Sequence, residues 1–215
     1  MLYDCRTVAD RDRGIAAAVE AVKSGELVVL PTDTVYGIGA DAFTPHAVTA
    51  LLNAKGRGRH MPPPVLVGSR HTLDGLVYSL PKAARELADA FWPGALTIIV
   101  EHSPSLQWDI GDTDGTVGVR MPLHPVALEV LREVGPMAVS SANKTGQPAA
   151  TTAEEAREQL EYSVRVYLEA GPAPDPVPST IVDVTGDVPR ILRAGAIPLE
   201  KLRDVVPDIL EPEAS

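Results

Sequence analysis

The segment Glu26-Leu-Val-Val-Leu-Pro-Thr-Asp-Thr-Val-Tyr-Gly-Ile-Gly39 joins a short apolar run to a polar loop. Residues 26–30 are almost all apolar and are followed by Pro31, which predicts a buried strand. The loop over 31–39 holds two threonine hydroxyls, one carboxylate and two glycines. Because open α/β sheets present ligands to the loops at their strand ends, this loop is either a small polar cradle for an amine and a hydroxyl or a capped turn.

Helical and extended patterns alternate along the rest of the chain. Apolar stripes, capping residues and proline or glycine stops predict helices over 12–24, 44–52, 81–91, 125–133, 152–161 and 198–206. Apolar runs predict further strands over 65–67, 96–101, 116–120, 137–139, 164–168, 180–184 and 190–192. This interleaving is typical of an α/β fold in which helices pack on a twisted, mostly mixed, open sheet. No internal repeat or convincing linker interrupts it, so we predict one domain over 1–210 and a polar tail over 211–215.

The charge balance narrows the class of protein. The 215 residues include 19 Lys and Arg against 29 Asp and Glu, which gives a formal net charge of −10. Such a charge argues against a broad electrostatic grip on nucleic acid or on an anionic membrane. Cys5 is the only cysteine, which excludes an internal disulfide and every cysteine-based zinc motif. Without an apolar run of about 20 residues or a signal-peptide pattern, we expect a soluble, cytoplasmic protein with no membrane partner.

Several common enzyme motifs are absent from the sequence. It contains neither a Walker-type phosphate loop nor the G-x-S-x-G turn of a hydrolase nucleophile. Residues 37–42 match the loose dinucleotide pattern G-x-G-x-x-A, but no helix follows at once and no acid stands about 20 residues further on. The five histidines lack metal-ligand spacing, so no metal site is predicted from them.

Polar clusters flank several of the predicted elements. The basic loop Lys55-Gly-Arg-Gly-Arg-His60 concentrates positive charge, and its glycines allow the backbone to approach an anion. Each of the other clusters is equally well a turn or a surface charge: they are residues 140–143, Arg120, Arg193 and the pair Ser179 and Thr180. Together these cations, hydroxyls and amides are the groups that a nucleoside triphosphate and a small amino acid require.

Seven short motifs, in this order, resemble the YrdC/TsaC family of threonylcarbamoyl-AMP synthases. The resemblance extends from about Gly25 to Ile197. The motifs are Pro31-Thr-Asp-Thr-Val-Tyr-Gly, Lys55-x-Arg57, Phe91-Trp-Pro-Gly94, Thr116-Val-Gly-Val-Arg120-x-Pro122, Ser141-x-Asn143 with Gly146, Ser179-Thr-Ile-Val-Asp183 and Ile191-Leu-Arg193-x-Gly195. Each motif is short, but seven of them in the right order form a highly specific match.

The resemblance implies a YrdC-like domain with a central ligand cleft and a nucleotidyltransferase activity. Such an enzyme takes L-threonine, bicarbonate and ATP, with Mg²⁺, to threonylcarbamoyl-AMP and pyrophosphate. Its product passes to tRNA threonylcarbamoyl-transferase proteins, which form threonylcarbamoyladenosine in tRNA. In-line attack of a carbamate on the α-phosphorus needs positioning and charge neutralisation rather than a side-chain nucleophile.

The family pattern also assigns roles to residues at matching positions. It implies that Lys55, Arg57, Ser141 and Asn143 handle ATP and catalysis, and that Thr116 and Arg193 contact the nucleotide. Its threonine contacts match Thr34, Arg120 and Ser179. No ligand for Mg²⁺ is identified; Asp33 is a candidate acid near the ion without direct coordination.

Two departures from the family pattern affect the details. Leu66 stands where family members commonly have a histidine, so a threonine contact is missing or replaced. Longer relatives append a C-terminal domain whose linker covers the site; without one, we expect a loop or a partner to close the cleft.

Two other functions remain open at this stage. The first is a double-stranded RNA or tRNA-binding module without synthase activity, which would use a local basic patch of Lys55, Arg57, Arg59, His60 and Arg70. The second is a related adenylate-forming activity on carbamoyl phosphate, as in hydrogenase maturation. The net charge weakens the first, and the absence of cysteine-rich or acylphosphatase segments counts against the second.

Overall fold

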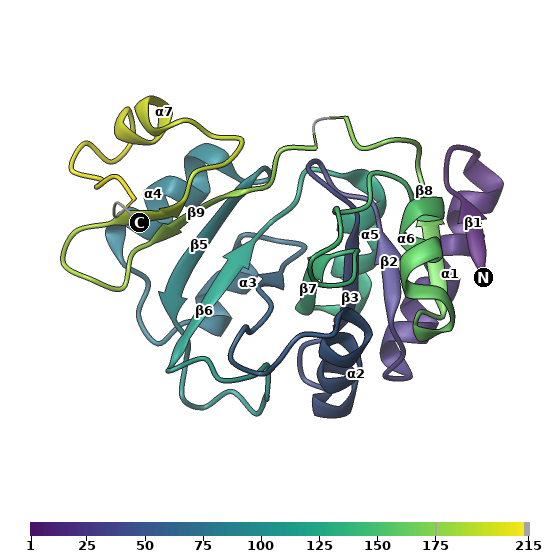
Figure 1. Cartoon of the computed structure of the whole chain (residues 1–215). Coiled ribbons are helices and arrows are strands. Elements are labelled where there is room, and N and C mark those ends of the chain that lie inside the picture. Colours follow the sequence, from purple (N-terminus) through teal and green to yellow (C-terminus); the bar gives the residue numbers. More distant parts are fainter. Residues whose placement is uncertain (175, 213–215) are drawn as a thin grey trace.

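A ten-stranded mixed sheet runs through the computed structural model, which describes residues 1–174 and 176–212 (Figure 1). The strand order is β1-β8-β2-β3-β7-β4-β6-β5-β9-β10. The bounds are β1 Leu2–Asp4, β2 Val28–Leu30, β3 Gly37–Asp41, β4 Val65–Leu66, β5 Leu96–Glu101, β6 Thr116–Arg120, β7 Met137–Ser141, β8 Val166–Glu169, β9 Thr180–Asp183 and β10 Arg190–Arg193. Parallel pairs (β1/β8, β2/β8, β4/β6, β5/β9) and antiparallel pairs (β2/β3, β3/β7, β4/β7, β5/β6, β9/β10) confirm the predicted mixed sheet.

Helices cover the sheet, and capping residues set where several of them begin. Thr7 and Thr152 each accept a hydrogen bond from a backbone N–H in the first turn of their helices, while Pro45 and Pro125 open two others. The bounds are α1 Val8–Lys23, α2 Pro45–Lys55, α3 His71–Leu76, α4 Lys82–Phe91, α5 Pro125–Val134, α6 Ala153–Leu160, the 3₁₀ turn η1 Glu161–Ser163 and α7 Leu199–Arg203. No helix among the described residues is long and apolar enough to cross a membrane.

The half of the sheet around β2 and β8 is covered on both faces. Val28 and Leu30 of β2 pack in one apolar cluster with α1 and α5, whereas Val29 packs in another with α2 and α6. Successive residues of a strand point to opposite faces, so a strand covered on both sides must be apolar throughout. This explains the continuous apolar run that predicted β2.

The half built from β5, β6 and β9 carries helices on one face only. Ile98, Val119 and Val182 pack in a single apolar cluster with α3, α4 and α7. The alternate residues face the other way: Ile99 pairs with Gly118, Leu66 with Arg120, and Thr97 with Ile181. All six of these line a cavity of about 670 Å³. The uncovered face of this half-sheet is therefore the floor of the cavity.

Three elements differ from the sequence-based expectations. Residues 37–39 begin β3 instead of ending a loop, and neither β1 nor α3 was expected. Gly37 and Gly39 are required in β3 because a Cβ there would lie 2.6 Å from Val139 Cγ1 and 2.7 Å from Met137 Cε, respectively. Glycine is depleted in strands, so the pattern resembled a loop. The domain boundary at 210 stays a prediction, and residues 213–215 of the expected tail lie outside the described residues.

We expect Gly37→Ala to lower the free energy of unfolding by about 1–3 kcal/mol, since its methyl group would overlap Val139. Urea denaturation measures the change. The double variant Gly37→Ala/Val139→Ala should be more stable than the sum of the single changes predicts. Gly75→Ala, where no atom lies within 4 Å of the added Cβ, is the control. Additive effects in the double variant would contradict the proposed close packing.

Candidate active site

The cavity collects most of the residues that the sequence assigned to substrates. Of the nine, seven line it: Thr34, Arg57, Thr116, Arg120, Ser141, Ser179 and Arg193. They come from the loop after β2, the loop after α2, the connection before β9, and strands β6, β7 and β10, which are far apart in sequence. Lys55 and Asn143 are not among the lining residues.

Arg120 lies in the floor of the cavity, at the end of β6. The residue as a whole is 7% exposed. Its Nε donates to the carbonyl of Gly94 at 3.0 Å, Nη1 donates to Thr34 Oγ1 at 3.0 Å, and Nη2 donates to Asp33 Oδ1 at 2.6 Å. Burial lowers the pKa of Arg120, while Asp33 acts in the opposite direction. An arginine has five N–H donors, so two are left without a partner among the described residues.

The hydroxyl of Thr34 is held by a small network within its own loop. Thr32 Oγ1 donates its single proton to the carbonyl of Val35 at 2.6 Å, so the 3.1 Å contact between the two threonine hydroxyls uses the proton of Thr34. Thr34 Oγ1 also accepts from Arg120. It therefore keeps one acceptor position and no free proton, which suits an amine or ammonium donor.

Arg193 and Ser179 form the opposite side of this end of the cavity. Arg193 donates to the backbone carbonyl of Ser179 through Nε at 3.1 Å and Nη2 at 2.7 Å, and Nη2 also lies 3.1 Å from Ser179 Oγ. The hydroxyl of Thr97 lies 2.9 Å from the same oxygen. Gly195 allows this approach, because a Cβ there would lie 2.4 Å from the carbonyl oxygen of Pro178.

Arg57 and Ser141 offer unused polar atoms elsewhere in the cavity. Arg57 Nη1 donates to Ser140 Oγ at 3.2 Å, but its buried Nε has no hydrogen-bond partner among the described residues. Burial lowers the pKa of Arg57. A buried donor without a partner is costly, so an anionic oxygen at Arg57 would be stabilising.

Lys55 is placed differently from the sequence-based expectation of a point charge for phosphate. It is the last residue of α2 and is 1% exposed. Its Nζ donates to the backbone carbonyls of Ser141 and Asn143, the second at 2.7 Å. The ammonium therefore binds the backbone of the turn after β7, and Lys55 is not among the residues that line the cavity.

Asn143 likewise serves the turn in which it lies. Its Nδ2 donates to the carbonyls of Lys144 and Gln147, both at 2.9 Å, and its Oδ1 lies 3.5 Å from Lys55 Nζ. These bonds use both amide protons. A direct contact from its side chain to ATP, as the family pattern implied, would require the loss of one of them.

Three arginines and no acid stand among the residues that line the cavity in the described part of the chain. Asp33, beside it, is bound to Arg120 and to the backbone N–H of Leu123. No group of three or more His, Cys, Asp or Glu among the described residues could hold a metal ion. The electrostatics of the cavity therefore suit an anion, and the apolar wall of Met61, Pro62, Pro63, Pro64, Leu66, Ile110 and Val117 suits a flat or methylated group beside it.

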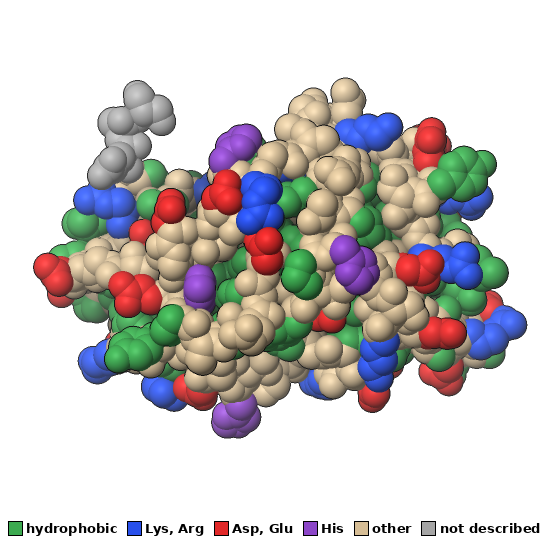
Figure 2. Space-filling view, turned by 90° about the horizontal axis from the view of Figure 1, so that it is seen from below, with side chains coloured by type: hydrophobic (Ala, Val, Ile, Leu, Met, Phe, Trp, Pro, Cys, Tyr) green, Lys and Arg blue, Asp and Glu red, His purple; other side chains and the backbone are tan. Residues whose placement is uncertain are grey.

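The basic patch of the RNA-binding alternative does not form an open cationic surface. Arg59 pairs with Asp109 at 2.7 Å and with Asp112 at 3.3 Å, and Arg70 donates to the backbone carbonyl of Trp92. Lys55 is buried and Arg57 lines the cavity. On one face of the molecule, basic and acidic side chains are interspersed (Figure 2).

Fold and cavity together define an α/β protein with a polar, cationic cleft on an open sheet face. The family described as Telomere recombination, Sua5/YciO/YrdC, matches residues 20–195. The chain belongs to this family, as the motifs predicted.

Relatives with assigned names agree with the family. A Mycobacterium tuberculosis (strain H37Rv) protein with the provisional name threonylcarbamoyl-AMP synthase is 62% identical over 204 residues, which cover 95% of this chain and 94% of that protein. Threonylcarbamoyl-AMP synthase of Bacillus subtilis (strain 168) is 37% identical over 201 residues, or 93% of this chain and 58% of that protein. The crystal structure of Pyrococcus abyssi Sua5 complexed with L-threonine superposes with a TM-score of 0.92 at 34% identity, covering 98% of this chain and 62% of that one. This chain thus spans about three fifths of the Bacillus and Pyrococcus proteins.

Three residues orient the expected ones: Asp33 fixes Arg120, Ser140 contacts Arg57, and Thr97 contacts Ser179. The sequence analysis named Asp33 and the cluster 140–143, but did not assign these orienting roles to them. It did not name Thr97, although the alternation of this threonine with the apolar Leu96 and Ile98 is a signal.

The buried position of Lys55 predicts a pH effect on stability. Burial, with the charge of Arg57, lowers its pKa from 10.5 to about 8. Between these values the unfolded chain binds more protons than the folded one, so the contribution of Lys55 to stability increases as pH rises. Urea denaturation from pH 8 to 10.5 should show the free energy of unfolding rising relative to that of Lys55→Met. A wild-type free energy of unfolding that stays constant or falls relative to that of Lys55→Met over this range would show that Lys55 is not buried in this way.

Proposed function

We propose that this chain is an L-threonylcarbamoyladenylate synthase, a nucleotidyltransferase that makes threonylcarbamoyl-AMP and pyrophosphate from L-threonine, bicarbonate and ATP. The observation that carries the proposal is the position of Arg120. Arg120 lines the cavity together with Thr34, Ser179 and two further arginines, and two of its N–H groups have no partner among the described residues. A relative with the same fold was solved with L-threonine, and others are named as this synthase.

Threonine fits the end of the cavity around Arg120. The carboxylate accepts from the two remaining guanidinium N–H groups, a charge-assisted pair of bonds worth about 1.5–3 kcal/mol each. The amine donates to the remaining lone pair of Thr34 Oγ1. The hydroxyl of Ser179 lies among the same group of residues and is available to the substrate hydroxyl.

ATP takes the remaining cations and hydroxyls. Its phosphates accept from the guanidinium of Arg57 and from the hydroxyl of Ser141, with Arg193 and Thr116 as further contacts. Mg²⁺ would be held on the phosphate oxygens of ATP, since the lining residues include no carboxylate, and it would supply further neutralisation of phosphate charge.

The reaction requires no nucleophile from the protein. The threonine amine and bicarbonate combine to a carbamate with loss of water. A carbamate oxygen then forms a bond to the α-phosphorus as the bond from that phosphorus to the pyrophosphate oxygen breaks. The chain contributes alignment through Arg120 and Thr34, and charge neutralisation through Arg57. Lys55 and Asn143 act as positioning residues, because both hold the turn that presents Ser141.

Later steps stay predictions from the sequence. The product would pass to tRNA threonylcarbamoyl-transferase proteins, and a cytoplasmic location would place the chain beside them. Four of the five residues of the proposed basic patch are buried, paired, bonded to a backbone carbonyl or directed to the cavity. The exposed His60 alone does not form a basic surface, so no observation favours the RNA-binding alternative.

The direct test incubates the purified chain with ATP, Mg²⁺, bicarbonate and L-threonine. We expect mass spectrometry to detect threonylcarbamoyl-AMP, with an equal amount of pyrophosphate, only when all components are present. Arg57→Ala, purified identically, is the control against a contaminating synthase and should lose most of the activity, by at least about tenfold. Product that forms without threonine, or a folded wild-type protein that forms none, would overturn the proposed function.

A further inference from the structure

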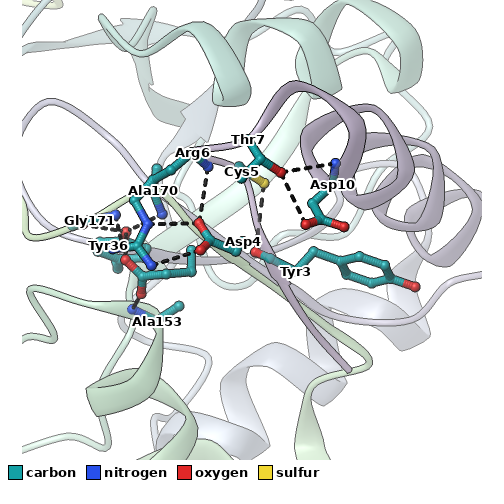
Figure 3. Close-up of polar contacts among 11 residues, drawn as sticks. Tyr3, Asp4, Cys5, Arg6, Thr7, Asp10, Tyr36, Ala153, Ala170 and Gly171 are labelled. Carbon is teal, nitrogen blue, oxygen red and sulfur yellow. Dashed lines mark hydrogen bonds and ion pairs between the residues drawn. The ribbon is translucent and has the colours of Figure 1, made fainter.

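The hydroxyl of Tyr36 forms polar contacts that have no role in the proposed reaction. Tyr36 is fully buried, at 0% exposure. Its hydroxyl donates to the carbonyl of Gly171 at 2.7 Å, accepts from the N–H of Ala170 at 3.0 Å and lies 3.2 Å from Glu169 Oε1 (Figure 3). Burial raises the pKa of Tyr36, so the hydroxyl keeps its proton.

The carboxylate of Glu169 organises the backbone around this hydroxyl. Glu169 is the last residue of β8 and is 3% exposed. Its Oε2 accepts from the N–H of Ala153 at 2.7 Å, at the start of α6, and Oε1 accepts from the N–H of Gly171. No Lys or Arg forms an ion pair with it among the described residues, so backbone donors take the place of a cation. Burial of a carboxylate costs free energy unless hydrogen bonds compensate for the lost water, so we expect Glu169 to have a structural or functional role.

Two segments that carry threonine contacts meet at this point. Tyr36 ends the loop that carries Thr34, and Gly171 begins the connection that ends at Ser179. That connection, of which residues 170–174 and 176–179 are described, joins β8, second in the sheet, to β9, ninth (Figure 1). Pro176, Pro178 and Ser179 line the cavity. Ser140 and Lys55 contact Arg57 and Ser141 on the phosphate side. The backbone carbonyl of Tyr36 also accepts from the N–H of Ala142 at 2.8 Å, but this bond does not involve the Tyr36 hydroxyl.

We propose that Tyr36 and Glu169 form a positioning pair for the threonine end of the site, which fixes Thr34 and Ser179 relative to each other. This inference rests on the proposed function. Glu169 is not among the residues that line the cavity. Tyr36 does line it, but its hydroxyl is bonded to Gly171 and Ala170 and lies beside Glu169. The pair acts through the loop after β2 and the connection after β8, so its loss should weaken threonine binding and leave ATP binding unchanged.

Tyr36→Phe removes the hydroxyl and keeps the packed ring. Tyr167→Phe is the matched control: Tyr167 is 2% exposed, and its hydroxyl donates to the carbonyl of Glu161 at 2.7 Å, away from the cavity lining. We expect the KM for L-threonine to rise about five- to tenfold in Tyr36→Phe, as the loss of about one hydrogen bond implies. The KM for ATP and kcat at saturating threonine should stay within about twofold. Tyr167→Phe should shift neither KM, even where it lowers Tm equally.

Glu169→Gln is the second variant. It keeps one oxygen for Gly171 or Ala153 but cannot accept from both, so the same selective rise in the threonine KM is expected. Calorimetric titration of L-threonine into each folded variant gives an independent measure of binding. An unchanged threonine KM in both Tyr36→Phe and Glu169→Gln, or equal shifts of the KM for threonine and for ATP, would overturn the proposed role of the pair. The proposed synthase function would still hold in that case, provided that the wild type turns over. Absence of turnover in the wild type would instead overturn the proposed function.

Discussion

The buried guanidinium of Arg120 is the interaction on which the site depends. It connects the loop after β2, through Asp33 and Thr34, with the turn before β5, through the carbonyl of Gly94. Burial of an arginine is costly unless its N–H groups find partners. Three neighbours accept hydrogen bonds from three of the five N–H groups of Arg120. In the proposed function, the two remaining N–H groups bind the carboxylate of threonine, so Arg120 would serve both the structure and substrate recognition.

The sheet makes this arrangement possible because its two halves are covered differently. Around β2 both faces are packed with helices, which gives a rigid support. Around β5 and β6 one face carries no helix. The small residues Gly118 and Thr97 on that face leave room for a cavity. Three segments at the cavity are held by buried polar groups: Arg120 holds the loop after β2, Lys55 the turn after β7 and Tyr36 the connection after β8. Positioning of this kind is what an in-line transfer between two bound substrates requires.

Much of the fold could be predicted from the sequence, because apolar runs and helix caps mark β2, β5, β6, α2 and α6 clearly. Seven of nine proposed contacts reach the cavity, since motifs at strand ends converge in an open sheet. The rest depends on tertiary packing. Strand β3 has glycine at positions 37 and 39 because the side chain of Val139 occupies the space that a Cβ would need at either position. Lys55 turns inward because the carbonyls after β7 need a donor, and a lysine at the end of a helix otherwise suggests a solvated charge.

The most direct measurement compares the binding of L-threonine and L-threoninol, which has an alcohol in place of the carboxylate, by calorimetry in the presence of an unreactive ATP analogue. If Arg120 holds the carboxylate through its two remaining N–H groups, L-threonine binds at least about tenfold more tightly, since each charge-assisted bond contributes about 1.5–3 kcal/mol. Equal affinities, or no binding of either compound, would contradict the assignment of Arg120 and with it the threonine end of the site.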